Sequence, residues 1–160
     1  MEYMNIDQKS NHIITDSKTS LAVARDLGEN ISPPFTIELI GDLGGGKTTF
    51  VKGLAKGLGI DKAIVSPTFT IRRSYLSPNG VCLDHYDLYR LDEDRAVLEE
   101  LRESCLDSNT IVAVEWGDNF EQVLPKDRLI IEFKFATENT RELIISSTGL
   151  KSANLIKKIK

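Results

Sequence analysis

A glycine-rich segment followed by a lysine and two threonines carries the clearest chemistry in this chain. Residues 41–49 read GDLGGGKTT and fit the pattern GxxxxGK[ST]. The segment lies between an apolar run at residues 35–40, which predicts a strand, and an amphipathic stretch at residues 50–58, which predicts a helix. This strand–loop–helix context separates a phosphate-binding P-loop from a chance match, so the chain is predicted to bind a nucleotide.

Each residue type in the loop suits an anion. The glycines let backbone N–H groups turn toward phosphate oxygens, and the N-terminus of the following helix adds partial positive charge. Lys47 is expected to reach the β- and γ-phosphates, Thr48 to ligate Mg²⁺, and Thr49 to touch the α-phosphate. The predicted nucleotide-binding residues of the loop are Asp42, Leu43, Gly44, Gly45, Gly46, Lys47, Thr48 and Thr49.

A second candidate element is the apolar run at residues 110–114, which ends in Glu115 and Trp116. A carboxylate at the C-terminal end of a buried strand faces the P-loop in Walker B elements. Glu115 is therefore predicted to hold Mg²⁺, directly or through water, or to orient the attacking water; the alternative is an ordinary surface carboxylate. Trp116 has two possible places, beside the nucleotide or in the core, and the burial habits of tryptophan slightly favour the core.

Residues 66–70, SPTFT, follow the predicted P-loop helix. Nucleotide switches place a loop that senses the γ-phosphate in this region. The hydroxyl of Thr68 or Ser66 could therefore reach Mg²⁺ or the γ-phosphate, although an ordinary polar turn fits the same residues.

Residues 85–91, HYDLYRL, form the weakest candidate. Period-two alternation puts His85 and Asp87 on the same side of a strand, where they could orient a water, and Arg90 could stabilise phosphate charge. The spacing by itself favours a cluster of salt bridges at the end of a hairpin.

The remaining pattern predicts the elements that position these residues. Helices are expected at 18–27 and 93–105, and strands at 12–15, 35–40, 69–76, 81–86, 110–114, 129–135 and 141–146. The predicted fold is an α/β, P-loop NTPase-like three-layer sandwich with a mixed sheet. Parallel strands should surround the P-loop, and antiparallel hairpins should lie at the edge.

The composition bounds the class of protein. A chain of 160 residues with 41% apolar and 28% charged residues predicts a single domain over 1–160, with flexible tails at 1–11 and 151–160. The net charge of −4 argues against broad nucleic-acid binding. The N-terminal residues lack a signal-peptide pattern, and no apolar run has transmembrane length, so a cytoplasmic protein without membrane contact is expected. Cys82 and Cys105 lack metal-site spacing and are expected to be reduced thiols.

In this order, the motifs GDLGGGKTTF, SPTFTI, HYDLYRL and VEWGD closely resemble those of the bacterial threonylcarbamoyladenosine-biosynthesis ATPases, the TsaE or YjeE family. The resemblance covers residues 18–149. It implies ATP and Mg²⁺ as cofactors and TsaB and TsaD as protein partners in threonylcarbamoyladenosine modification of tRNA. It also implies that ATP binding and hydrolysis reset or regulate the partner complex, and we expect tRNA to be contacted only indirectly.

The resemblance assigns roles by position. It implies that Lys47 binds phosphate, that Thr48 and Glu115 handle Mg²⁺, that Thr68 lies near the γ-phosphate, that Asp87 is an acidic position associated with activity, and that Trp116 lies near the nucleotide. Gly45 stands where alanine is common, and residues 102–106 depart from the glycine and aromatic-containing helix that often follow in the family.

Two other functions fit a P-loop on a short chain. A small-molecule kinase would need an arginine-rich lid, and the sequence shows none. A nucleotide-gated binding module with negligible turnover needs the same phosphate contacts as an ATPase. Arg72, Arg73 and Arg90 are all candidates for an arginine finger, and the sequence does not choose among them.

Overall fold

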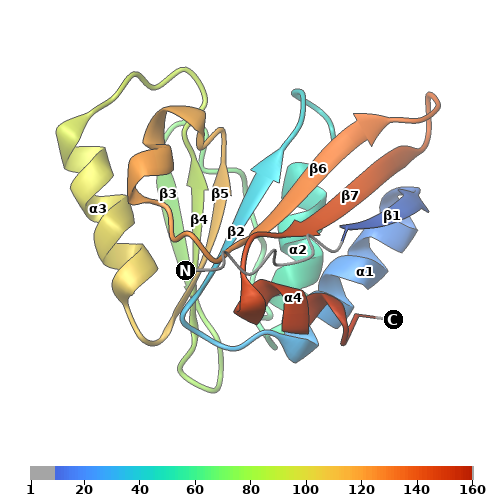
Figure 1. Ribbon diagram of the computed structural model, residues 1–160, viewed down its shortest axis with the longest axis horizontal. Coiled ribbons are helices and arrows are strands. Elements are labelled where there is room, and N and C mark those ends of the chain that lie inside the picture. Colours follow the sequence, from blue (N-terminus) through green and yellow to red (C-terminus); the bar gives the residue numbers. More distant parts are fainter. Residues whose placement is uncertain (1–9, 160) are drawn as a thin grey trace, which may run out of the picture.

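The computed structural model describes residues 10–159, which form a seven-stranded mixed sheet with helices on both faces (Figure 1). The strands are β1 (Ser10–Thr15), β2 (Phe35–Ile40), β3 (Arg72–Leu76), β4 (Cys82–Asp87), β5 (Thr110–Glu115), β6 (Leu129–Phe135) and β7 (Arg141–Ser147). The helices are α1 (Ser17–Asn30), α2 (Lys47–Gly57), α3 (Arg95–Leu106) and α4 (Leu150–Ile156), with a 3-10 helix η1 (Asp118–Val123).

The strand order is β1-β7-β6-β2-β5-β4-β3. Strand β2 is central and pairs in parallel with both β5 and β6, and β4 pairs in parallel with β5. The pairs β3–β4, β6–β7 and β1–β7 are antiparallel and lie toward the two edges. The predicted α/β sandwich, with parallel strands beside the P-loop and antiparallel hairpins at the edge, is confirmed.

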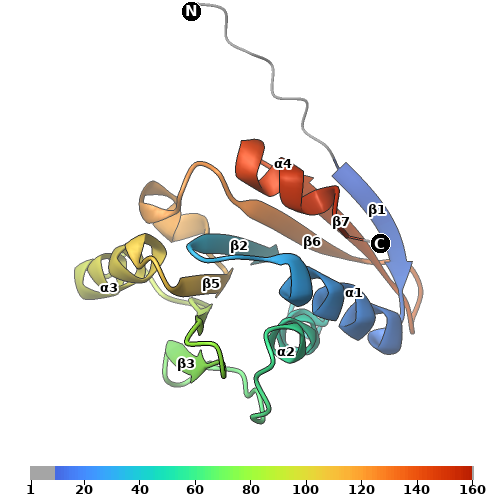
Figure 2. The same cartoon turned by 90° about the horizontal axis from the view of Figure 1, so that it is seen from below.

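Helices α1 and α2 cover one face of the sheet, while α3, η1 and α4 lie on the other (Figure 2). Successive side chains of the inner strands point alternately to the two faces of the sheet and pack in different core clusters. In β5, Ile111 and Ala113 pack in the cluster that contains α1 and α2, whereas Val112 and Val114 pack with α3 and η1. Every residue of β5 is buried, which is the pattern of a parallel strand covered on both sides.

Helices α1 and α2 touch backbone to backbone. A Cβ added at Gly53 of α2 would lie 2.5 Å from the Leu21 carbonyl oxygen and 2.7 Å from the Ala24 Cβ of α1. Gly57 and Gly28 likewise leave no room for a side chain at the crossing. The helix that begins at the P-loop is thus fixed against its neighbour by glycine contacts.

Helices α1 and α3 are each capped by the aspartate that precedes their first residue. The Asp16 side chain accepts a hydrogen bond from the Thr19 backbone N–H, and Asp94 accepts from Ala96 and Val97.

The expectation of a flexible C-terminal tail over 151–160 was wrong for residues 151–156, and residue 160 lies outside the described residues. Residues 150–156 form α4, whose Ser152, Ala153, Leu155 and Ile156 are buried. Asp127 accepts hydrogen bonds from the backbone N–H groups of Lys151 and Ser152, which anchors the first turn. At the other end, Ser10 and Asn11 belong to β1, and the rest of the expected N-terminal tail lies outside the described residues. Within residues 10–159, no helix is long and apolar enough to cross a membrane.

Candidate functional site

The glycine-rich loop joins the end of β2 to the start of α2. Gly44 and Gly46 have φ angles of 74° and 99°, in the left-handed region that favours glycine. A Cβ at either position would meet nothing within 4 Å, so the requirement for glycine is conformational. The Gly45 N–H bonds to the Asp42 carbonyl oxygen at 3.0 Å and closes the loop.

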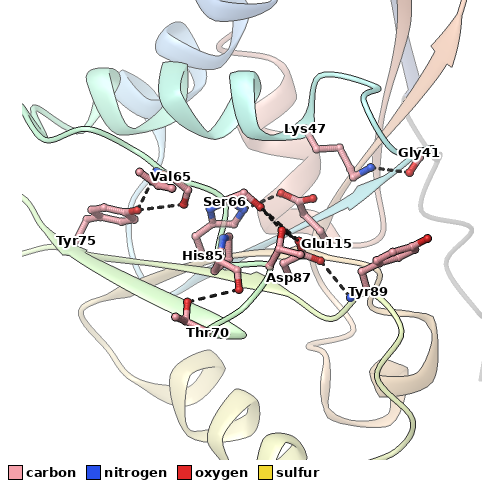
Figure 3. Close-up of polar contacts among 12 residues, drawn as sticks. Gly41, Lys47, Val65, Ser66, Thr70, Tyr75, His85, Asp87, Tyr89 and Glu115 are labelled. Atoms are coloured by element: carbon pink, nitrogen blue, oxygen red, sulfur yellow. Dashed lines mark hydrogen bonds and ion pairs between the residues drawn. The ribbon is translucent and has the colours of Figure 1, made fainter.

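Lys47 is buried at the first turn of α2, and its Nζ donates to the carbonyl oxygens of Gly41 at 2.6 Å and Asp42 at 2.9 Å (Figure 3). The ammonium also lies 4.7 Å from the centre of the Trp116 ring, a cation–π contact. Burial lowers the pKa of Lys47, and the negative charges of Glu115 and Asp87 oppose that shift. Burial outweighs the nearby carboxylates, so the net effect of the site is a lowered pKa for Lys47.

The loop opens onto a cavity of about 310 Å³ at the C-terminal ends of β4 and β5. The residues that line it are Leu43, Gly44, Gly45, Gly46, Lys47, Thr48, Thr49, Ser66, Thr68, Asp87, Glu115 and Trp116. The structure thus brings the predicted site residues together around one cavity, apart from Asp42, whose contribution is its main-chain carbonyl. Trp116 is half-buried: it lines this cavity and also packs against the core cluster on the α3 face, so it occupies both of the places considered for it.

Glu115 ends β5, and its carboxylate is buried beside β4. Its Oε1 lies 2.7 Å from His85 Nε2, and both side chains are almost fully removed from solvent. Alternation along the strand predicted Asp87 as the carboxylate beside His85, whereas the structure places the ring against Glu115, which the parallel pairing of β4 with β5 brings close.

Asp87, at the end of β4, holds the loop of residues 66–70. Its Oδ2 accepts hydrogen bonds from Thr68 Oγ1 at 3.0 Å and Ser66 Oγ at 3.4 Å, and its Oδ1 accepts from the Tyr89 N–H at 3.1 Å. The expected hairpin-end cluster of salt bridges is therefore replaced by a carboxylate–hydroxyl cluster that faces the cavity. Arg90 is exposed, stacks over the Tyr89 ring at 4.9 Å, and does not line this cavity.

Three non-glycine residues with positive φ flank the site: Ile71 at 64°, Arg90 at 59° and Trp116 at 60°. Ile71 and Trp116 directly follow the 66–70 loop and β5, and Arg90 lies three residues beyond the end of β4. Backbone strain of this kind persists where the surrounding structure overdetermines it, and it gathers at binding sites.

A second cavity of about 290 Å³ lies on the other side of the loop. It shares Gly44, Gly45, Gly46 and Thr49 with the first and is completed by Thr15, Asp16, Ser17, Ser20, Phe133, Glu138, Asn139, Arg141 and Leu143. Sequence reasoning missed these residues. They lie at residues 15–20 and 133–143, and they reach the P-loop through the packing of α1 on α2 and through the β1–β7 and β2–β6 pairings.

The donor set suits Mg²⁺. Thr48 and Glu115 offer a hydroxyl and a carboxylate on the same cavity. Among the described residues, no group of three or more His, Cys, Asp or Glu is placed to hold a metal ion. That combination fits a hard cation held by one or two protein oxygens together with phosphates, rather than by an all-protein cage.

The fold and the loop define an α/β protein of the P-loop class. Comparison with known proteins gives the family. The family described as "Threonylcarbamoyl adenosine biosynthesis protein TsaE" matches residues 14–143, and the chain belongs to this family.

Two relatives named tRNA threonylcarbamoyladenosine biosynthesis protein TsaE illustrate the match. The protein from Nostoc sp. is 35% identical over 159 residues, which cover 98% of this chain and 97% of the relative. The protein from Bacillus subtilis is 38% identical over 130 residues, which cover 80% of this chain and 79% of the relative. The crystal structure of Bacillus subtilis YdiB superposes with a TM-score of 0.80 at 32% identity and covers 95% of both chains. The family places this chain in tRNA threonylcarbamoyladenosine biosynthesis.

Proposed function

We propose that this protein binds ATP with Mg²⁺ and hydrolyses it slowly, and that this cycle resets or regulates a TsaB–TsaD complex during threonylcarbamoyladenosine modification of tRNA. The observation that carries the proposal is the meeting of Lys47, Thr48 and Glu115 at one cavity beside the P-loop, in a chain of the TsaE family. Phosphoryl transfer asks chiefly for positioning and charge neutralisation, which these groups can provide.

In this proposal Lys47 and the loop N–H groups bind the phosphates. Thr48 and Glu115 hold Mg²⁺, which neutralises phosphate charge when bound. Asp87 and Thr68 lie on the same cavity and are assigned to the γ-phosphate side. The second cavity, across the loop, takes the nucleoside.

Two further observations support dependence on partners. Within residues 10–159, no arginine lines the cavity that holds Lys47, so a charge supplied in trans would raise the rate of hydrolysis. The net charge of −4 favours contact with tRNA through the partners rather than directly.

Phosphate release from ATP tests the proposal, measured with and without Mg²⁺ and with and without TsaB and TsaD. Lys47→Ala and Glu115→Ala should abolish it, and Lys52→Ala, at an exposed position of α2, should leave it unchanged. A low rate that rises with the partners supports the proposal. Nucleotide binding without turnover would instead favour a nucleotide-gated module, and a rate indifferent to the partners would prompt a search for a kinase acceptor.

A further inference from the structure

The imidazole of His85 is the group closest to the Glu115 carboxylate. His85 lies in β4 with its side chain 0% exposed, and its Nε2 lies 2.7 Å from Glu115 Oε1. In the parallel register of β4 and β5, His85 pairs with Ala113 and Asp87 pairs with Glu115. The imidazole therefore reaches diagonally along the sheet to the last residue of the neighbouring strand (Figure 3).

Core packing does not account for this imidazole. Its Nδ1 is buried and has no hydrogen-bond partner among the described residues. A buried polar atom without a partner costs free energy that an apolar side chain of similar size would not. What remains is the single bond from Nε2 to Glu115.

We propose that His85 is a positioning residue that holds Glu115 by Oε1 and leaves Oε2 for Mg²⁺ at the cavity shared with Thr48. A ring nitrogen that donates to a carboxylate fixes its orientation, as outer partners of metal ligands commonly do. The inference rests on the proposed function, in which Glu115 holds the metal. It adds that Glu115 binds the metal through a single carboxylate oxygen, and that His85, which does not line the cavity, determines which of the two oxygens is free to do so.

Binding, rather than turnover, gives the decisive test. Trp116 is the chain's one tryptophan and lines the cavity, so its fluorescence can follow ADP binding in EDTA and then a Mg²⁺ titration at saturating ADP. In His85→Leu we expect the Mg²⁺ midpoint to rise by about tenfold or more, the usual effect of losing such a partner. ADP affinity in EDTA should stay within about twofold, because His85 touches no phosphate-binding group. His85→Gln, whose amide nitrogen stands where Nε2 stood, should restore most of the Mg²⁺ response.

A double variant separates positioning from a general structural effect. If His85 acts through Glu115, His85→Leu should not change the Mg²⁺ midpoint further in a Glu115→Ala background. A wild-type midpoint in His85→Leu would overturn the inference, as would a Gln variant no better than Leu. If His85→Leu does not fold, His85→Asn replaces it, since this shorter amide should lose the Mg²⁺ response that Gln keeps. Wild-type protein whose ADP binding ignores Mg²⁺ would overturn the metal role of Glu115 itself, a failure visible before any His85 variant is made.

Discussion

Thr68 Oγ1 donates a hydrogen bond to Asp87 Oδ2 across 3.0 Å, and this bond joins the 66–70 loop to the end of β4. The loop returns to the sheet through the Asp87 N–H, which donates to the Ile71 carbonyl oxygen at 2.9 Å. One residue thus holds both ends of a segment that borders the phosphate-binding loop.

Asp87→Ala should release this loop. A hydrogen bond to a charged group contributes about 1.5–3 kcal/mol, and the loss here should lower the free energy of local opening by about that amount. Amide hydrogen exchange of residues 67–71 should accelerate while exchange in β5 stays slow. Asp92→Ala, at an exposed acid that follows the same strand, is the matched control. Unchanged protection of the loop in Asp87→Ala would show that its backbone contacts suffice.

The buried ion pair of Glu38 and Arg128 should be costly to break on one side. Arg128 Nε lies 2.7 Å from Glu38 Oε2, and Nη1 donates to the Pro125 carbonyl oxygen at 3.1 Å. Arg128→Met leaves a buried carboxylate unpaired and should cost about 3–5 kcal/mol in urea unfolding. Adding Glu38→Leu should recover much of that loss, since an apolar pair carries no desolvation penalty. If the two single losses simply add, the pair is not coupled.

Gly53→Ala should destabilise the protein even though alanine favours helices by about 1 kcal/mol. The added methyl would press on the Leu21 carbonyl oxygen and Ala24 of α1, and overpacking of this kind costs about 1–3 kcal/mol. Thermal unfolding should show a lower Tm than wild type, whereas Lys56→Ala, exposed on the same helix, should be close to neutral. A Gly53→Ala protein more stable than wild type would mean that α1 and α2 separate without cost.

The thiol of Cys82 should lose its proton at a higher pH than a solvent-exposed cysteine does. Burial, followed by the negative charge of Asp84, raises the pKa of its thiol from 9.0 to about 11. Between these values the unfolded chain has already lost the proton that the folded chain keeps, so this contribution to stability is complete below pH 9.0 and declines as the pH rises toward about 11. Thiolate absorbance of Cys105→Ala protein, in which Cys82 is the remaining cysteine, should show the late midpoint. A midpoint near 9.0 would place the thiol in water.

Short apolar runs in the sequence correctly predicted individual strands. Residues 35–40 and 129–135 predicted the observed bounds of β2 and β6, because apolar runs with turn residues on either side depend little on distant contacts. Helix α4 was missed for the opposite reason. The lysines in this segment are typical of a solvent-exposed chain end. The helix is instead stabilised by packing against the sheet and by hydrogen bonds to Asp127, which lies more than twenty residues earlier in the chain.

The candidate site divides in the same way. The P-loop and the acid at the end of β5 could be found from sequence because each is a contiguous pattern with its own physical logic. The bonds from His85 to Glu115 and from Asp87 to Thr68 could not, because each joins side chains that only strand pairing or loop closure brings together. The pairing of β4 with β5 decides the first bond and the closure of the 66–70 loop decides the second, and no local pattern in the sequence specifies either contact.

The central place of β2 has a consequence for how the protein is made. Strand β2 spans residues 35–40, yet its two neighbours, β5 and β6, end at residues 115 and 135. At about 5–20 residues per second of synthesis, the phosphate-binding loop leaves the ribosome several seconds before the strands that support it. Nascent chains that stop short of β5 should therefore not retain nucleotide, and the ability to bind should emerge late, once most of the polypeptide is free to fold.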